Sequence, residues 1–313
     1  MNRSGVATFV SNLVRPRPPG RGRRFSRRRV VGEAITGAVF GSGWAARAWG
    51  RLPGRTAVDL VTHDFPLLPA RAAPRRPLRI AFASDLHIGP LTAPALLDNA
   101  FTRLGQLQAD VLVLGGDYVY LEATHQMARE LEARVAALPI PTKLAILGNH
   151  DLWTHHDRIE DALRRAGARI LINDAAFLPP PFEDVAIIGL DDVWTGHADA
   201  AAAMRAAAGA SLTIGIAHSP EAVPLLKDCK LPLLLCGHTH GGQIALPSGP
   251  VVVHGKHGRR WPAGLYEVDG GMRLFVSRGL GSVELPIRAY ARPDVSLFTL
   301  NPSDLAEIPG REQ

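Results

Sequence analysis

A series of polar clusters, each directly after a run of apolar residues, constrains the fold of this 313-residue chain more than any other feature. A short apolar run bounded by turn residues is typical of a buried strand. Open α/β sheets collect their functional side chains where the carboxyl ends of the strands meet. The clusters are Asp85-Leu86-His87, Gly116-Asp117, Gly148-Asn149-His150-Asp151, Ala217-His218-Ser219 and Gly237-His238-Thr239-His240-Gly241-Gly242. The sequence therefore predicts aspartate, asparagine and histidine side chains along one edge of a sheet.

The side chains in these clusters offer nitrogen and oxygen ligands and no thiolate, which suits Mn²⁺, Fe or Zn²⁺ better than a structural zinc site. A carboxylate at a strand end, such as that of Asp117, can bridge two cations. Two divalent ions about 3.5–4 Å apart generate a hydroxide and neutralise the charge of an in-line phosphoryl displacement. Nearby glycines suit tight turns close to the ions. They are Gly115, Gly116, Gly148 and Gly237. We therefore expect two divalent metal ions and hydrolysis of a phosphate ester.

The rest of the chain alternates expected strands with expected helices. Strands are predicted over 57–62, 79–83, 110–114, 143–147, 185–190, 212–217, 233–236, 243–246, 264–268, 273–276 and 295–300. Helices are predicted over 93–107, 124–137, 158–166 and 198–208. The alternation predicts a sheet built from β-α-β units, and the strand-rich C-terminal third predicts a second, mixed sheet packed on it. The predicted organisation is a basic N-terminal segment over 1–48, a lead-in over 49–77, one α/β domain over 78–301 and a tail over 302–313.

The basic character of the chain is confined to its N-terminal segment. Residues 1–48 contain ten arginines and one acid, Glu33, and so carry +9, whereas the whole chain carries +6. Subtracting +9 from +6 leaves −3 for residues 49–313. A basic patch on the folded domain is the usual electrostatic sign of nucleic-acid binding, so no nucleic-acid partner is expected. Cys229 and Cys236 imply no disulfide framework, and Cys236 is expected to be a buried packing residue.

The N-terminal segment also resembles an export signal. Ser26-Arg27-Arg28-Arg29-Val30-Val31 is similar to the twin-arginine pattern, an apolar stretch runs over 30–46, and Ala46-Arg47-Ala48 offers a small-residue cleavage site. Glu33 and the high Gly and Ala content make the stretch a poor permanent membrane span. We expect export to the periplasm or the outer face of the cell membrane. The open alternatives are a basic tail, or an uncleaved helix on the membrane surface of a cytoplasmic protein.

Taken in order, the series D-x-H, G-D, G-N-H-D, H and G-H-T-H resembles the calcineurin-like metallophosphoesterase superfamily over about residues 78–300. The resemblance implies a four-layer α/β/β/α sandwich of two mixed β-sheets flanked by helices. It also implies that Asp85, His87, Asp117 and His240 hold one metal ion. Asp117 as a bridge, with Asn149, His218 and His238, would hold the second ion. The implied acid that protonates the leaving oxygen is His150, with Asp151 as the partner of its imidazole.

Further segments resemble the exported YkuE/YaeI-type bacterial phosphodiesterase subgroup. They are Gly189-Leu190-Asp191-Asp192-Val193-Trp194, Ser277-Arg278-Gly279-Leu280-Gly281, Leu285-Pro286-Ile287-Arg288 and Arg292-Pro293-Asp294. This resemblance and the predicted export favour a phosphodiester of a phospholipid or nucleotide-sugar lipid, with a membrane surface as a further partner. Gly116-Asp117-Tyr118-Val119 continues with Tyr120-Leu121-Glu122 and not with the Asp-Arg-Gly of protein Ser/Thr phosphatases, which argues against a phosphoprotein substrate.

Several interpretations stay open at this point. The alternative to an enzyme is a catalytically silent scaffold with the same fold. His155 and His156 could line the rim of the substrate site or be solvated loop residues. The segment from His254 to Trp261 could contact an anionic head group or be a plain surface loop. The sequence does not indicate the oligomeric state.

Overall fold

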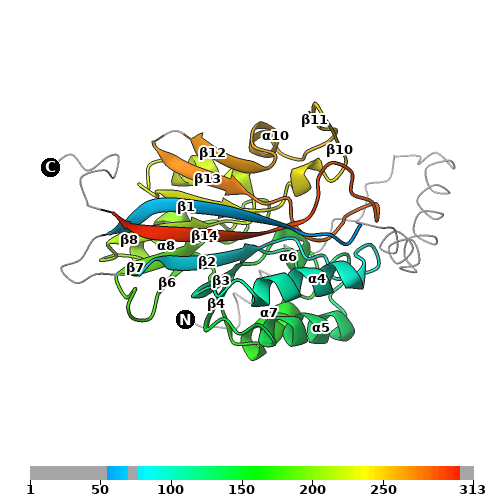
Figure 1. Cartoon of the computed structure of the whole chain (residues 1–313), viewed down its shortest axis with the longest axis horizontal. Coiled ribbons are helices and arrows are strands. Elements are labelled where there is room, and N and C mark those ends of the chain that lie inside the picture. Colours follow the sequence, from blue (N-terminus) through cyan, green and yellow to red (C-terminus); the bar gives the residue numbers. More distant parts are fainter. Residues whose placement is uncertain (1–54, 70–75, 269, 304–313) are drawn as a thin grey trace, which may run out of the picture.

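Two six-stranded mixed sheets pack face to face in the computed structural model, with helices on both outer faces (Figure 1). The structure describes residues 55–69, 76–268 and 270–303. The first sheet has the order β1-β14-β2-β3-β4-β5. Its strands are β1 (Asp59–Pro69), β14 (Asp294–Ser303), β2 (Leu78–Ala83), β3 (Val111–Leu114), β4 (Thr142–Ala145) and β5 (Ala168–Ile170).

The second sheet has the order β12-β13-β9-β8-β7-β6. Its strands are β12 (Gly264–Val268), β13 (Met272–Val276), β9 (Leu233–Cys236), β8 (Leu212–Ile216), β7 (Val185–Gly189) and β6 (Asp174–Phe177). A separate hairpin joins β10 (Ala245–Leu246) to β11 (Gly249–Pro250). The helices with four or more residues are α4 (Pro94–Gly105), α5 (His125–Ala136), α6 (Asn149–Leu152), α7 (His156–Arg165), α8 (Ala200–Ala206), α9 (Val223–Leu226) and α10 (Lys256–Arg260). The predicted four-layer α/β/β/α sandwich is therefore confirmed.

The apolar residues of the strands alternate between two cores, because successive side chains of a strand point to opposite faces. In β2, Ile80 and Phe82 pack between the two sheets, whereas Ala81 and Ala83 face the helices. A third cluster lies between the second sheet and the helices α8 and α9. Burial on both faces explains why these strands appear in the sequence as continuous apolar runs.

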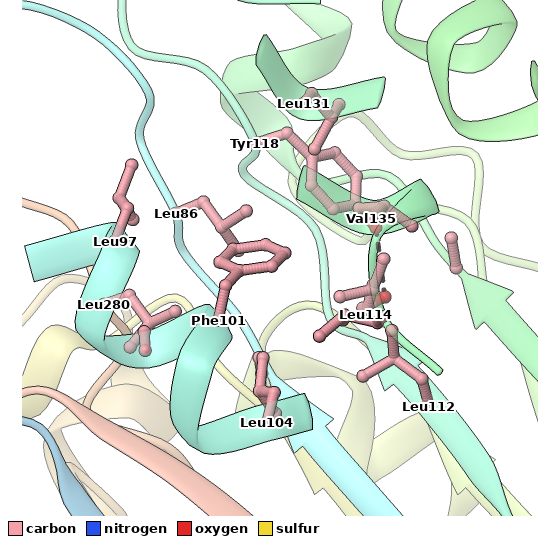
Figure 2. Packing of buried hydrophobic residues seen from close by; sticks show 14 of the residues in the cluster. Leu86, Leu97, Phe101, Leu104, Leu112, Leu114, Tyr118, Leu131, Val135 and Leu280 are labelled. Atoms are coloured by element: carbon pink, nitrogen blue, oxygen red, sulfur yellow. Dashed lines mark hydrogen bonds between the residues drawn. The ribbon is translucent and has the colours of Figure 1, made fainter. Parts of the chain in front are cut away.

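Helices α4 and α5 cover the outer face of the first sheet through one apolar stripe each. Figure 2 shows Phe101 and Leu104 of α4 and Leu131 of α5 in the cluster that includes Leu112 and Leu114 of β3. The N-terminus of α5 is fixed by Thr124, whose side chain accepts a hydrogen bond from the backbone N–H of Met127 at 3.2 Å. Burial of each leucine or phenylalanine side chain contributes about 1.5–3 kcal/mol. This packing holds the strand ends that carry the polar clusters.

The largest departure from the sequence prediction concerns β14. The C-terminal third was expected to form the second sheet, but β14 returns to the first sheet between β1 and β2. It pairs parallel with β1 and antiparallel with β2, and its Phe298 lies in the core between the sheets. The central strands β7, β8 and β9 belong instead to the second sheet. Sequence patterns show that a strand exists but contain no information on its distant partner.

Smaller departures concern short elements. The strands β5 and β6 and the helix α6 were not predicted, because three or four residues give too few positions for a periodic signal. The strand expected over 243–246 contains only the two residues of β10. β1 falls in the expected lead-in and is longer than predicted; it forms the edge of the first sheet.

The predictions for the basic segment over 1–48 and for residues 304–313 of the tail lie outside the described residues. Within 55–69, 76–268 and 270–303, no helix has the length and apolar character needed to cross a membrane.

Candidate metal centre and active site

Five parallel strands from the two sheets end at the same side of the molecule and position the predicted ligands there. In the first sheet β2, β3 and β4 are parallel, and the loops after them carry Asp85, Asp117 and Asn149. In the second sheet β8 and β9 are parallel, and the loops after them carry His218 and His238. The two sets of loops are joined directly, because the backbone N–H of His238 donates to the Asp85 carboxylate at 3.0 Å. The sandwich therefore brings ligands from both sheets to one place.

The side chains form two groups of three, and within each group the ligand atoms lie within 4.8 Å of one another. One group contains Asp85, His87 and His240, and the other contains Asp117, His218 and His238. We refer to these six residues and Asn149 as the metal-ligand cluster. In the first group Asp85 Oδ1 lies 3.4 Å from His240 Nε2. Each group contains three of the four residues that the family resemblance implies for one ion; Asn149 is in neither group, and Asp117 is in the second only.

Asp117 lies between the two groups. Its Oδ2 lies 3.1 Å from His218 Nε2 in its own group and 3.6 Å from His87 Nε2 in the other. The backbone N–H of His150 donates to its Oδ1 at 2.9 Å. The Asp117 carboxylate is therefore in the right place to contact two cations at once.

Five members of the metal-ligand cluster have left-handed backbone conformations. Their φ angles are +54° at Asp85, +42° at His87, +57° at Asp117, +70° at His238 and +54° at His240. A non-glycine residue in this region costs about 1–3 kcal/mol and persists only where the surrounding structure imposes it. Such conformations collect at functional sites. The backbone strain therefore supports a functional role for the same residues that the sequence motifs single out.

Two glycines allow the loops to approach the ligands. A Cβ at Gly237 would collide with Ser84 Oγ and Asp85 Oδ2, and a Cβ at Gly148 would collide with Asp117 Oδ1. Any larger residue at these positions would push the carboxylates away from the histidines. The glycines that the sequence places beside the clusters thus serve the approach of backbone to ligand.

Burial of the cluster disfavours its charged forms. Burial raises the pKa of Asp85 to about 6 and lowers the pKa of His87 and of His238 to about 3. Burial would also raise the pKa of Asp117, but the adjacent His218 holds it well below its usual range. Neutral imidazoles and ionised carboxylates are the forms that bind a metal ion. A bound cation would thus favour ionisation of the buried carboxylates.

The donor set fits two divalent cations. Asn149 Oδ1 and His238 Nε2 are buried and have no hydrogen-bond partner within the described part of the chain, although buried polar atoms are nearly always paired. His87 Nε2 and His240 Nε2 face each other at 3.1 Å. Histidine nitrogen with carboxylate and amide oxygen is a ligand combination that Mn²⁺, Fe and Zn²⁺ accept. The residues present therefore match the expected metal ions.

His150 and Asp151 occupy different surroundings. His150 is half-buried, and its ring lies 5.0 Å from that of His87 and 5.0 Å from that of Trp153. Asp151 is fully buried, and its carboxylate accepts hydrogen bonds from the backbone N–H groups of Asp117, Tyr118 and Gly148 at 2.8–3.0 Å. The described hydrogen bonds of Asp151 do not include the imidazole of His150, the partner expected from the sequence. Its contacts instead connect the loop after β3 to the loop after β4.

A buried arginine behind the cluster was not predicted as a site residue. Arg288 Nη2 lies 2.8 Å from His240 Nδ1, and its Nη1 donates to the carbonyls of Arg278 and Ala291 at 2.9 and 3.0 Å. Burial lowers the pKa of this guanidinium to about 10. Arg288 therefore holds the His240 ring from the side away from Asp85. The sequence signal was a lone cation in the largely apolar segment Leu285-Pro286-Ile287-Arg288.

A cavity of about 560 Å³ opens beside the cluster. Its polar lining includes Asp117, Asn149, His150, His238 and His240. Most of the remaining lining is apolar, and among the described residues that line it none is lysine or arginine. A substrate phosphate at the metal-ligand cluster would thus place its organic groups in a mainly uncharged space.

The secondary predictions have mixed outcomes. His254 lines the cavity, but His155 and His156 are not among the residues that line it; Trp153 is. Residues 256–260 form α10, and His257 pairs with Glu221 at 2.7 Å. Asp192 is fully buried with its Oδ2 accepting from the backbone N–H of Thr195 at 2.9 Å, as in a turn. Cys236 is a fully buried core residue, as expected, and burial raises the pKa of its thiol.

Comparison with known proteins gives the same picture as the geometry. The family model described as calcineurin-like phosphoesterase matches residues 78–242. Phosphodiesterase YaeI of Escherichia coli K12 is 27% identical over 249 residues, which cover 77% of this chain and 88% of that protein. The metallophosphoesterase YkuE of Bacillus subtilis 168, whose function is uncharacterized, is 28% identical over 226 residues, 71% of this chain and 78% of that protein.

A solved structure of a 5'-nucleotidase precursor from Thermus thermophilus is similar with a TM-score of 0.42 and 15% identity over 73% of this chain and 56% of that chain. The family model covers more than half of the chain and contains all five polar clusters, the last of which ends at Gly242. The predicted superfamily and the relationship to the YkuE/YaeI-type subgroup are thus confirmed. The chain belongs to the calcineurin-like phosphoesterase family, whose members use a divalent metal centre, and it is a hydrolase acting on phosphoric ester bonds.

Proposed function

We propose that the protein hydrolyses a phosphodiester at a centre of two divalent metal ions. The observation that carries the choice of a diester is the lining of the cavity, which combines apolar side chains with an absence of lysine and arginine among its described residues. A monoester dianion is usually bound with additional cationic side chains. A diester has one negative charge and two organic groups, and so suits a mainly uncharged cavity. The similarity to the phosphodiesterase YaeI supports the same choice.

In this proposal Asp85, His87 and His240 hold one ion, and Asn149, His218 and His238 hold the other. Asp117 contributes to both, because its carboxylate lies near histidines of both groups. When bound, the two ions supply Lewis acidity and offset the negative charge on the phosphate oxygens. Mn²⁺, Fe and Zn²⁺ all suit these ligands.

The residues of the chain then have separate tasks. His150 lines the cavity next to the ligands, where its imidazole donates a proton to the oxygen of the departing alcohol. Asp151 holds the backbone of Asp117 and Gly148, so that the Asp117 carboxylate keeps its place between the two groups. Arg288 fixes the ring of His240. Trp153, itself exposed, packs edge-on against the ring of His150.

The test compares bis(p-nitrophenyl) phosphate with p-nitrophenyl phosphate as substrates of the Mn²⁺-loaded protein. We expect hydrolysis of the diester to be faster than that of the monoester. We also expect it to be lost in Asp117→Ala and strongly reduced in His150→Ala, with metal content retained in the second variant. Faster monoester turnover would overturn the choice of a diester. Full diester turnover in Asp117→Ala would overturn the proposed centre.

A further inference from the structure

Part of the cavity lining consists of apolar side chains that hydrolysis itself does not require. These residues, which we call the apolar wall, are Trp153, Trp194, Ile244, Val251, Val252 and Leu285. Four of them are strongly exposed: Trp153 is 63%, Trp194 44%, Val251 57% and Val252 61% exposed. Large apolar side chains gathered at the surface mark a binding site more often than isolated ones do. The exposure of the apolar wall therefore indicates that it binds an apolar group.

The apolar wall is held in place by the surrounding chain. Gln243, just before the hairpin, donates from Nε2 to the carbonyls of Val283 and Leu285 at 2.8 and 2.9 Å, and its Oε1 accepts from the backbone N–H of Val283 at 2.8 Å. The backbone N–H of Ala245 donates to the carbonyl of Ala289 at 2.8 Å. These bonds connect the two segments that carry Ile244 and Leu285. The wall is thus formed before a ligand arrives, as is usual for small-molecule sites.

The wall also continues directly into the site of chemistry. The ring of Trp194 lies beside that of His238, with centroids 5.1 Å apart and planes tilted by 36°, and the rings of Trp153 and His150 meet edge-on with centroids 5.0 Å apart. His238 and His150 also line this cavity. A ligand with a phosphate at the metal-ligand cluster would therefore place a group attached to that phosphate against the two tryptophans.

The size and charge of the cavity identify the class of that group. A volume of about 560 Å³ is in the range of sites for drug-sized ligands and exceeds what a phosphate alone fills. The described lining residues offer Glu284 but no lysine or arginine, so a second anionic group would be unfavourable there. An uncharged chain of methylene groups suits Val251 and Val252, the exposed valines directly after β11.

Building on the proposed phosphodiesterase function, we propose that the apolar wall binds an alkyl or acyl chain of the substrate. The substrate class is then an amphiphilic phosphodiester, with its phosphate at the metal-ligand cluster. Its chain lies along the wall from Trp153 and Trp194 towards Val251 and Val252.

The test measures binding, so that it does not depend on turnover. The probes are O-methyl, O-butyl and O-octyl methylphosphonate, which carry one negative charge like a diester, titrated calorimetrically into the Mn²⁺-loaded full chain below their micelle concentrations. A fully buried methylene improves affinity about fourfold. Because the wall is half-exposed, we expect O-octyl to bind about 100-fold more tightly than O-methyl methylphosphonate. Equal affinities of the three probes would overturn the proposal.

A pair of matched variants locates the effect. Val252→Asp should reduce the ratio of octyl to methyl affinity to about tenfold or less, because a carboxylate beside the chain must lose part of its hydration. Leu225→Asp is the control, since Leu225 is a 45% exposed apolar residue of α9 that does not line the cavity. It should keep the wild-type ratio. An unchanged ratio in Val252→Asp, or an equal loss in Leu225→Asp, would overturn the assignment to the wall.

Two further measurements distinguish this inference from the proposed function and from a membrane contact. Turnover of bis(p-nitrophenyl) phosphate tests the proposed function, whereas the affinity ratio tests the wall, so either can fail alone. Sedimentation with phosphatidylcholine vesicles tests a membrane contact. Vesicle binding that depends on Val252, together with equal affinities for the three soluble probes, would replace the chain site with a membrane-docking surface.

Discussion

The metal-ligand cluster and the apolar wall border the same cavity but are built in opposite ways. The cluster consists of polar side chains that follow the strand ends, and most of them are buried. Five of its residues have left-handed backbone conformations. The wall consists of apolar side chains, four of them exposed, on loops and on the segments that flank the hairpin of β10 and β11. Reaction chemistry requires fixed ligands, whereas substrate choice can vary with loop residues on a constant scaffold. In the proposed function, the chemistry is therefore located in the sandwich and the choice of substrate in the loops outside it.

The largest effect that can test this separation is metal removal. Dialysis against a chelator should abolish diester turnover, and addition of Mn²⁺, Fe²⁺ or Zn²⁺ should restore it. Free ion at 100 times its Kd should raise the free energy of unfolding by about 2.7 kcal/mol. The methylphosphonates should all bind more weakly to the chelated protein, but the ratio of octyl to methyl affinity should persist. A ratio that disappears with the metal would show that cluster and wall are not separate.

The next effect concerns the residue shared by the two groups of ligands. Asp117→Asn removes a negative charge that lies 3.1 Å from His218 and 3.6 Å from His87. Turnover should fall by about 10³-fold, and bound Mn²⁺, measured by emission spectroscopy, should fall below two ions per chain. Asp98→Asn is the control, because Asp98 is a 63% exposed surface carboxylate that pairs with Arg134. Two ions retained in Asp117→Asn would contradict the bridging role.

A smaller effect concerns the support of the cluster. In Asp151→Asn the amide group cannot accept all the hydrogen bonds that the carboxylate accepts from Asp117, Tyr118 and Gly148. A buried N–H left without a partner costs about 1–3 kcal/mol, which should lower the Tm by several degrees in a calorimetric scan. The exposed Asp228→Asn variant should leave the Tm unchanged. A wild-type Tm in Asp151→Asn would show that these hydrogen bonds do not stabilise the fold.

The smallest effect concerns the support of the cavity lining near Val253. Glu221 accepts hydrogen bonds from His257 and Gly258 of α10, and Gly258 packs near Val253, which lines the cavity. Burial would raise the pKa of Glu221, but the hydrogen bonds from His257 hold it below its ordinary value of 4.5. A carboxyl whose pKa is lowered by folding stabilises the protein above its unfolded pKa, and the benefit is lost as the pH falls through its folded pKa.

The Tm of wild type should therefore exceed that of Glu221→Gln above pH 4.5, and the difference should shrink below that pH and disappear once the pH has fallen through the lowered, folded pKa. The difference should correspond to less than about 1 kcal/mol, because the pair is partly exposed. Glu267→Gln on β12 serves as the matched control. A pH-independent difference between wild type and Glu221→Gln would exclude titration of this carboxyl as the cause.

The comparison of cluster and wall also explains what the sequence could predict. The cluster was predictable because every ligand follows one of five apolar strands within a few residues, and parallel strands bring such positions together. The strands β2, β3, β8 and β9 were placed to within one residue for the same local reason.

The features that were missed depend on contacts between distant segments. Hydrophobicity alone does not distinguish an exposed Val251 or Val252 from a buried strand residue, so the apolar wall left no signal. The contact of Arg288 with His240 and the return of β14 to the first sheet join segments far apart in the chain. The backbone partners of Asp151 were missed because the local spacing does not show that three backbone N–H groups surround its carboxylate.

The position of β14 has a consequence for biosynthesis. Asp59 at the start of β1 pairs with Asp294 at the start of β14, and β14 also separates β1 from β2 (Figure 1). The edge strand β1 thus cannot join its sheet until β14 has left the ribosome. The segment that contacts His240 through Arg288 is made just before β14. Early chains consequently expose the unpaired side of β2 during translation, and a ribosome that stops before residue 294 releases a protein without its completed first sheet.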